Sequence, residues 1–167
     1  SFGADMSDGK YASERGVVYK DRNGNSGHYM DIMKKYGFEW IRIRVLVNPP
    51  GDHALYQTTS YARDVCQTAK SKGLKVLLVF FYSDWWCDPG QNPRPASWPG
   101  DQNQLEDTLY NYTRDTINTI GVNNLDMVAI GNEIDNMMCG TTGTNKRRLV
   151  DKVPSVFYLP LYIPNAA

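Results

Sequence analysis

The sequence predicts an α/β fold built on a parallel sheet, and three features support this prediction. Segments typical of strands and of helices alternate along the chain, as in repeated right-handed βαβ units. Residues 74–81 form a nearly continuous apolar run, which is typical of a parallel strand covered on both faces. Polar residues crowd the carboxyl ends of the later strands, and no glycine-rich phosphate-binding turn follows the first strand. The third feature favours a closed barrel over an open nucleotide-binding sheet.

The predicted elements have recognisable start and stop signals. We expect strands at residues 2–6, 40–47, 74–81 and 125–130, and helices at residues 29–36, 60–73 and 105–120. Gly37, Gly73 and Gly121 stand where the three helices should end. Ser60 is the expected N-cap of the second helix. Residues 7–27 are expected to form turns.

The second predicted strand carries two arginines on one face. In residues 41–45, Arg42 and Arg44 alternate with apolar side chains, so the two kinds of residue lie on opposite faces. If the apolar face meets the helices, the arginines point inward, where an unpaired charge is costly. We therefore expect partners for them, with Asp5 on the first strand and Glu133 after the fourth as candidates. The alternative is an arginine that reaches water at a strand edge.

Composition narrows the kinds of partner. Lysine plus arginine number 18, as do aspartate plus glutamate, so the formal net charge is zero and does not favour nucleic acid or an anionic membrane. No apolar run approaches the roughly 20 residues that a membrane span requires. No charged leader with an apolar stretch precedes Phe2, so an exported protein would have lost its signal peptide before this point. Without metal-ligand spacing or a phosphate fingerprint, we predict no metal and no cofactor.

The three cysteines do not form a disulfide scaffold. Cys66 lies in a predicted helix and is expected to be a small buried residue. Cys87 and Cys139 lie in predicted loops, so a disulfide between them requires that the two loops converge.

Glu133 is the candidate catalytic residue. It follows the fourth apolar strand in the sequence Gly131-Asn132-Glu133, which places a carboxylate at the mouth where barrel enzymes keep their catalytic groups. The alternative is a strand-end carboxylate that only caps the next helix.

The loop of residues 83–100 is rich in aromatic surface. It contains Trp85, Trp86 and Trp98, more ring surface than a connection needs. Exposed flat rings stack on the apolar faces of sugars, so this loop suggests a carbohydrate site. Tryptophans that cover the edge of a core are the alternative.

Several motifs appear in the order and at the spacing of one known family. They are Gly3-Ala4-Asp5-Met6-Ser7, Tyr19-Lys20 with Asn23-Gly24, Ile41-Arg42-Ile43-Arg44 with Val47-Asn48-Pro49, Lys75-Val76-Leu77-Leu78, Tyr82-Ser83-Asp84 with Trp86 and Asp88-Pro89, Leu109-Tyr110-Asn111-Tyr112-Thr113, and Ile130-Gly131-Asn132-Glu133-Ile134. Each motif alone is weak, but the ordered set is specific. Over about residues 2–138 the chain resembles glycoside hydrolase family 53.

This resemblance implies a fold, an activity and roles for particular residues. Members of the family are secreted endo-β-1,4-galactanases that cut the galactan side chains of pectin, fold as (β/α)8 barrels and retain anomeric configuration. By resemblance, Glu133 is the general acid/base, Asn132 orients the substrate and Arg42 holds the nucleophile. The residues expected to contact substrate are Trp86, Asp84, Trp98 and Asn48.

The resemblance also has limits. Residues 1–140 are expected to form about the first four β/α units, and residues 141–167 an unmatched C-terminal tail. The family's nucleophile, a glutamate near the end of the seventh strand, has no counterpart here, so we expect a truncated enzyme. Where the family usually has Asp and His in the third strand, this chain has Val79 and Phe81. The alternatives to an enzyme are a non-catalytic galactan-binding relative and an interaction module, and open sheet edges predict self-association.

Overall fold

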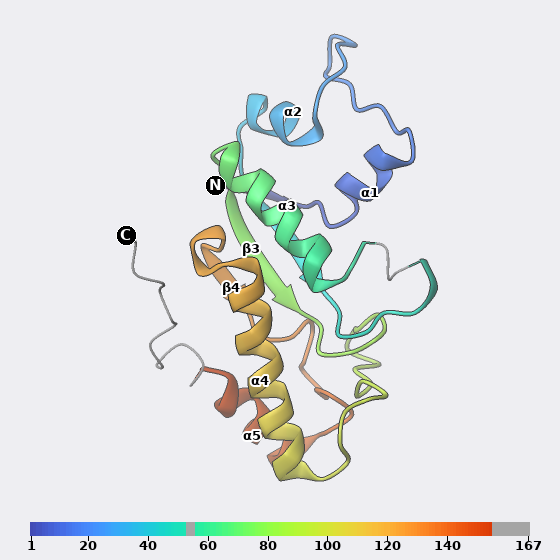
Figure 1. The fold of residues 1–167 in the computed structure, drawn as a ribbon, viewed down its shortest axis with the longest axis vertical. Helices are drawn as coiled ribbons and strands as arrows, with labels where there is room; N and C mark the ends of the chain where they lie inside the picture. The colour runs from blue at the N-terminus through green and yellow to red at the C-terminus, as the bar shows by residue number, and fades with distance from the viewer. Residues whose placement is uncertain (53–55, 155–167) are drawn as a thin grey trace.

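A computed structural model describes residues 1–52 and 56–154, with a parallel sheet at the centre (Figure 1). The strands lie side by side in the order β1 (Phe2–Asp5), β2 (Phe38–Val45), β3 (Lys75–Phe80) and β4 (Met127–Ala129). Each neighbouring pair is parallel. The connecting helices are α2 (Tyr29–Lys35), α3 (Thr59–Ser71) and α4 (Gln102–Ile120). The predicted alternation of strands and helices is confirmed.

Residues at the helix ends explain where the helices begin and stop. Thr58 caps α3, because its Oγ1 accepts a hydrogen bond from the backbone N–H of Tyr61 at 3.3 Å. The predicted N-cap, Ser60, is therefore wrong; it lies in the first turn of α3. A different helix, α4, ends at Gly121, whose φ of +89° is a conformation that glycine adopts without strain. A short 3-10 helix, η2 (Val122–Asn124), then leads into β4.

One face of the sheet is buried under helices. Ile41, Ile43 and Val45 of β2 are fully buried, and so are Leu105 and Leu109 of α4. Figure 1 shows α3 and α4 running along the same side of the sheet. The alternating pattern of β2 therefore places its apolar face against the helices, as predicted.

The opposite face carries the arginines. Arg42 and Arg44 of β2 share it with Leu77 of β3 and Met127 of β4. The upstream part of this face forms an open trough of about 310 Å³. In the residues that the structure describes, the two faces therefore differ sharply in burial.

Two helices were not predicted. The first, α1 (Gly9–Glu14), is short and lies in the segment expected to form turns. The second, α5 (Gly143–Lys152), lies in the predicted tail and packs on α4. Leu149 is fully buried there, and Arg148 forms an ion pair with Glu106 of α4 at 2.7 Å. The sequence of α5 is mostly polar and shows no apolar stripe at helical spacing, because so few of its residues are buried. The helix could therefore not be predicted from periodicity.

The buried packing of α4 leads to a stability prediction. Replacing Leu109 with Ala removes a fully buried side chain, and we expect the free energy of unfolding to fall by roughly 2–5 kcal/mol. Urea unfolding followed by circular dichroism measures the change. Val122→Ala is the control, because Val122 is 41% exposed, and it should stay within about 0.5 kcal/mol. Equal effects of the two substitutions would contradict the packing of α4.

Candidate active site

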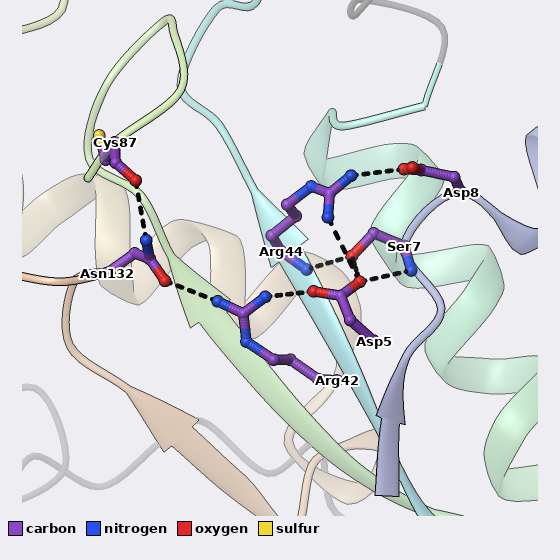
Figure 2. A network of polar contacts seen from close by, with 7 residues as sticks. All are labelled: Asp5, Ser7, Asp8, Arg42, Arg44, Cys87 and Asn132. Atoms are coloured by element: carbon purple, nitrogen blue, oxygen red, sulfur yellow. Dashed lines mark hydrogen bonds and ion pairs between the residues drawn. The ribbon is translucent and has the colours of Figure 1, made fainter.

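Asp5, at the end of β1, joins the two arginines of β2 (Figure 2). Its Oδ2 accepts a hydrogen bond from Arg42 Nη1, and its Oδ1 lies 3.4 Å from Arg44 Nη1. Asp8 pairs with the other amino group of Arg44, at 2.6 Å. The register of the sheet places Asp5 directly beside Arg42, so the pairing follows from the strand order. Asp5 is confirmed as the predicted partner.

Ser7 fixes the orientation of the Asp5 carboxylate. The hydroxyl of Ser7 donates to Asp5 Oδ1 at 2.6 Å, and its backbone N–H donates to the same oxygen at 3.0 Å. Burial acts to raise the pKa of Asp5, but the hydrogen bonds from Ser7 and the charges of Arg44 and Arg42 outweigh burial, so the pKa is lowered. Asp5 is therefore a charged anchor.

Asn132, after the end of β4, is the second partner of Arg42. Arg42 Nη2 donates to Asn132 Oδ1 at 2.6 Å, and Asn132 Nδ2 donates to the carbonyl oxygen of Cys87 at 2.8 Å (Figure 2). These two bonds fix the amide and tie β4 to the loop after β3. The expectation that Glu133 would pair with the arginines is wrong, because the chain turns at Asn132 and that residue faces them instead.

Glu133 lies on a tight turn at the mouth. Gly131 has φ +89° and Glu133 has φ +50°, a conformation that costs a non-glycine residue of order 1 kcal/mol or more. The side chain is exposed, and its carboxylate forms no hydrogen bond or ion pair within residues 1–52 and 56–154. The turn thus presents a carboxylate that is free to meet a ligand.

Asn92 supports this turn, although no pattern in the sequence indicates such a role. It is 1% exposed, and its Nδ2 lies 3.5 and 3.4 Å from the carbonyl oxygens of Asn132 and Glu133. The backbone carbonyl oxygen of Asn92 accepts a hydrogen bond from the backbone N–H of Gly140 at 2.6 Å. A single asparagine in a proline-containing loop has no pattern that could have revealed this role.

The three tryptophans of the 83–100 loop lie in different environments. Trp85 and Trp86 are 48% and 47% exposed, and the Trp86 ring stacks on the guanidinium of Arg44 at 5.3 Å. Trp98 is 8% exposed and packs edge-on against Tyr112. Its predicted role as a sugar platform is therefore wrong, because the ring covers the core.

Asp84 and Asn48, two of the predicted substrate contacts, hold loops together. Asp84 Oδ1 accepts a hydrogen bond from the backbone N–H of Asn48 at 2.9 Å, and Oδ2 accepts one from that of Ala96 at 2.8 Å. Asn48 itself is exposed at the rim. The carboxylate of Asp84 thus shapes the mouth, while a direct contact with substrate stays a prediction.

An apolar cluster lies beside the polar network. Val79 and Phe81 pack with Leu46 and Cys87, and the Phe81 ring meets the edge of Trp86 at 5.4 Å. Both Val79 and Phe81 are nearly fully buried. Trp86 thus stands over an apolar floor, next to the arginines.

All three cysteines are free and buried. The possible Cys87–Cys139 disulfide is therefore absent. The two thiols instead donate to the carbonyl oxygens of Phe81 and Tyr82, respectively. Burial raises the pKa of the Cys87 thiol to about 11, which makes it a poor nucleophile at neutral pH.

The described part of the chain holds neither a candidate membrane span nor a candidate metal cluster. No helix there is long and apolar enough to cross a membrane. No group of three or more His, Cys, Asp or Glu side chains there could hold a metal ion.

Polar groups gathered at the carboxyl ends of parallel strands define part of a βα-barrel of the enzyme type, whose active sites lie at that end. The sequence model of glycosyl hydrolase family 53 matches residues 1–157, and the chain belongs to that family. Its fold is about the first four β/α units of a (β/α)8 barrel.

Several relatives resemble the chain closely. It is 39% identical over 136 residues to an arabinogalactan endo-β-1,4-galactanase of Humicola insolens, covering 79% of the chain and 40% of that relative. It is 38% identical over 144 residues to one of Thermothelomyces thermophilus, covering 84% and 42%.

Two solved structures that resemble the chain belong to the same kind of protein as the sequence relatives. A fungal β-1,4-galactanase superposes with a TM-score of 0.85 at 35% identity, covering 93% of the chain and 48% of the other. The family 53 catalytic domain of Ignisphaera aggregans gives a TM-score of 0.86 at 30% identity, covering 93% and 47%.

The chain thus spans less than half the length of these relatives. The family match runs past the boundary predicted at residue 140 and includes α5. The division into residues 1–140 and a separate tail at 141–167 stays a prediction, and residues 155–167 lie outside the described part.

The Asp5 anchor leads to a prediction about pH. Asp5→Asn removes the charge that pairs with the arginines, and we expect a loss of roughly 1–3 kcal/mol in the free energy of unfolding at neutral pH. Because the folded-state pKa lies below the ordinary value of 3.8, this stabilisation is complete above that value and is lost as pH falls through the folded-state pKa. The difference between wild type and variant should therefore shrink in acid.

Urea unfolding at about pH 7, 5 and 3 measures this difference. Asp115→Asn, which alters an exposed carboxylate, is the control and should change stability by less than about 0.5 kcal/mol throughout. The free energies of unfolding of the wild type and of Asp5→Asn are compared at each pH. If their difference stays constant from pH 7 to 3, Asp5 is not the anchor.

Proposed function

We propose that this chain is part of an endo-acting glycoside hydrolase that cleaves β-1,4-galactan with retention of configuration. The observation that carries the proposal is the pair Asn132 and Glu133 at the end of β4, with Asn132 held by Arg42, in a member of family 53. The names of the two fungal relatives support the substrate class.

In this proposal Glu133 is the general acid/base. Within the described residues its carboxylate has no competing partner, so it can reach a glycosidic oxygen. Asn132 uses one amide N–H on Cys87, which leaves the other for a sugar hydroxyl. Arg42 keeps the amide in that orientation from its position between Asn132 and Asp5.

The nucleophile of this proposal comes from another part of the barrel. A retaining glycosidase needs two carboxyl groups about 5 Å apart. Asp5 lies on the same face, but Ser7 and the two arginines occupy its oxygens. We therefore assign the nucleophile, by family resemblance, to a glutamate near the end of a seventh strand.

Trp86 is the proposed sugar platform. Its half-exposed ring borders a pocket of about 270 Å³ that is also lined by Trp85, Leu46 and Gln57. A ring that is supported by Arg44 on one side and Phe81 at its edge has little freedom left to lose on binding. We propose that this ring binds the galactan side chains of pectin. We also propose that the protein is secreted.

The second candidate is a galactan-binding relative that does not catalyse. Val79 and Phe81 favour it, because they form an apolar floor that can neither donate hydrogen bonds nor carry charge. An interaction module is the remaining alternative. As partners we propose a galactan chain at the mouth and a second copy of this chain at the sheet edges.

Sugar binding tests the platform. Added galacto-oligosaccharides should change the tryptophan fluorescence, and Trp86→Ala should weaken binding by roughly tenfold, or about 1.4 kcal/mol. Trp98→Phe, which alters a buried ring, is the control and should leave the affinity unchanged. No response at millimolar oligosaccharide would argue against a galactan site.

Activity tests the role of Glu133. The 167-residue chain alone should not hydrolyse β-1,4-galactan, whereas a barrel completed with the C-terminal half of the Humicola insolens relative should. In that chimera Glu133→Gln should reduce kcat by roughly 10²–10⁴-fold, the usual contribution of general acid–base catalysis. The control is Asp135→Asn, an exposed carboxylate two residues away. Full activity of Glu133→Gln would remove Glu133 from the acid/base role.

A further inference from the structure

Asparagine side chains join the loop after β3 to the loop after β4. Three successive carbonyl oxygens of the first loop accept hydrogen bonds from asparagine amides, at Cys87, Asp88 and Pro89. In that order the donors are Asn132 at 2.8 Å, Asn92 at 3.0 Å and Asn136 at 3.0 Å. Asn92 is the central donor and is buried, whereas Asn136 is exposed.

Asn92 also reaches the turn that carries Glu133. Besides its bond to Asp88, Asn92 Nδ2 lies 3.5 and 3.4 Å from the carbonyl oxygens of Asn132 and Glu133. An amide nitrogen carries two hydrogens, so one serves Asp88 and the other is shared between the two carbonyls of the turn. The reverse orientation of the amide would set its oxygen against three carbonyl oxygens. The donor side of Asn92 is therefore fixed toward the turn.

Lys146 of α5 holds the next two carbonyl groups of the same segment. Its Nζ donates to the carbonyl oxygens of Ile134 at 3.1 Å and of Asp135 at 2.5 Å. Four successive carbonyl oxygens, from residue 132 to residue 135, thus meet a side-chain donor from another segment. Glu133 has φ +50°, and a strained turn of this kind persists only where its surroundings determine it. Asn92 and Lys146 supply that constraint on both sides of Glu133.

We infer that Asn92 and Lys146 are positioning residues for Glu133. They act through backbone carbonyl groups and leave the carboxylate free to meet a substrate. A misplacement of about 1 Å in a reacting group can cost roughly a hundredfold in rate, so the position of this turn matters to the reaction. The inference rests on the proposed acid/base role of Glu133, but the order of the turn can be measured without any activity.

Nuclear magnetic resonance of the full 167-residue chain tests the order of the turn. Asn92→Asp is nearly isosteric but sets a carboxylate against three carbonyl oxygens, and Lys146→Met removes the donor while it keeps a long side chain. The backbone N–H order parameter of Glu133 should be about 0.85 in the wild type and should fall toward about 0.6 in each variant. Circular dichroism checks that each variant keeps its secondary structure.

Asn136→Ala is the matched control. It removes an asparagine bond to the same loop, at Pro89, but no bond to the carbonyl groups of the turn. The order parameter of Glu133 should therefore stay at its wild-type value. A fall equal to that of the other two variants would mean a general loosening of the loops and would overturn the inference.

Kinetics test the catalytic consequence, in the barrel completed with the C-terminal half of the Humicola insolens relative. Asn92→Asp and Lys146→Met should each lower kcat by roughly ten- to a hundredfold and leave KM nearly unchanged, because the sugar platform Trp86 is not altered. Burial raises the pKa of the carboxyl group introduced by Asn92→Asp, and its protonated form again offers a donor. The loss of kcat in this variant should therefore shrink as the pH falls. Asn136→Ala should keep the wild-type kcat.

The outcomes separate this inference from the proposed function. A variant of Asn92 or Lys146 that keeps the wild-type order parameter, or keeps the wild-type kcat in a barrel that needs Glu133, excludes that residue from the positioning role. A Glu133 that is already mobile in the wild type excludes both. Full activity of Glu133→Gln would instead contradict the proposed function, and the order parameters alone would then decide whether Asn92 and Lys146 hold the turn.

Discussion

The ion pairs of Asp5 with Arg42 and Arg44 are the interaction on which the mouth of this fold depends. Two guanidinium groups on the inward face of β2 would be costly if they were unpaired. Asp5 pairs with both arginines, and Asp8 pairs with Arg44 as well, so the two positive charges meet two negative ones. Arg42 then has a fixed position from which it holds Asn132. Asn132 in turn binds the carbonyl oxygen of Cys87, so one carboxylate organises β1, β2, β4 and the loop after β3.

The mouth combines a charged half and an apolar half. Asp5 and the arginines form the first, and Val79 and Phe81 form the second beneath Trp86. The arginines bridge the two halves, because Arg44 stacks on Trp86 while it pairs with Asp5. Such a floor supports the Trp86 ring but offers a sugar no hydrogen bond and no charge. This lack of polar groups is the physical reason why a non-catalytic binding protein stands beside an enzyme as a candidate function.

The fold consists of local units that leave one large surface to a distant partner. The helices α2 and α3 pack on strands that are their neighbours in the sequence, and α4 packs on α3. The helical face of the sheet is therefore buried by residues within the chain's own β/α units. The inner face of a barrel is buried only when the sheet closes on itself. Its open trough and exposed edge residues Phe2 and Met127 are therefore consequences of the four-strand sheet.

The order of strands and helices, the two faces of β2 and the family could all be predicted from the sequence, which also offered Asp5 as one of two candidate partners for the arginines. These properties follow from apolar periodicity, from the cost of an unpaired inward charge and from ordered motifs. The folded arrangement was needed to show that Asn132 and not Glu133 meets Arg42, that Trp98 belongs to the core and that α5 packs on α4. It also decided the support of the mouth by Asn92. These outcomes depend on how a turn or loop bends over distant residues, and that bend leaves no periodic signal in the chain.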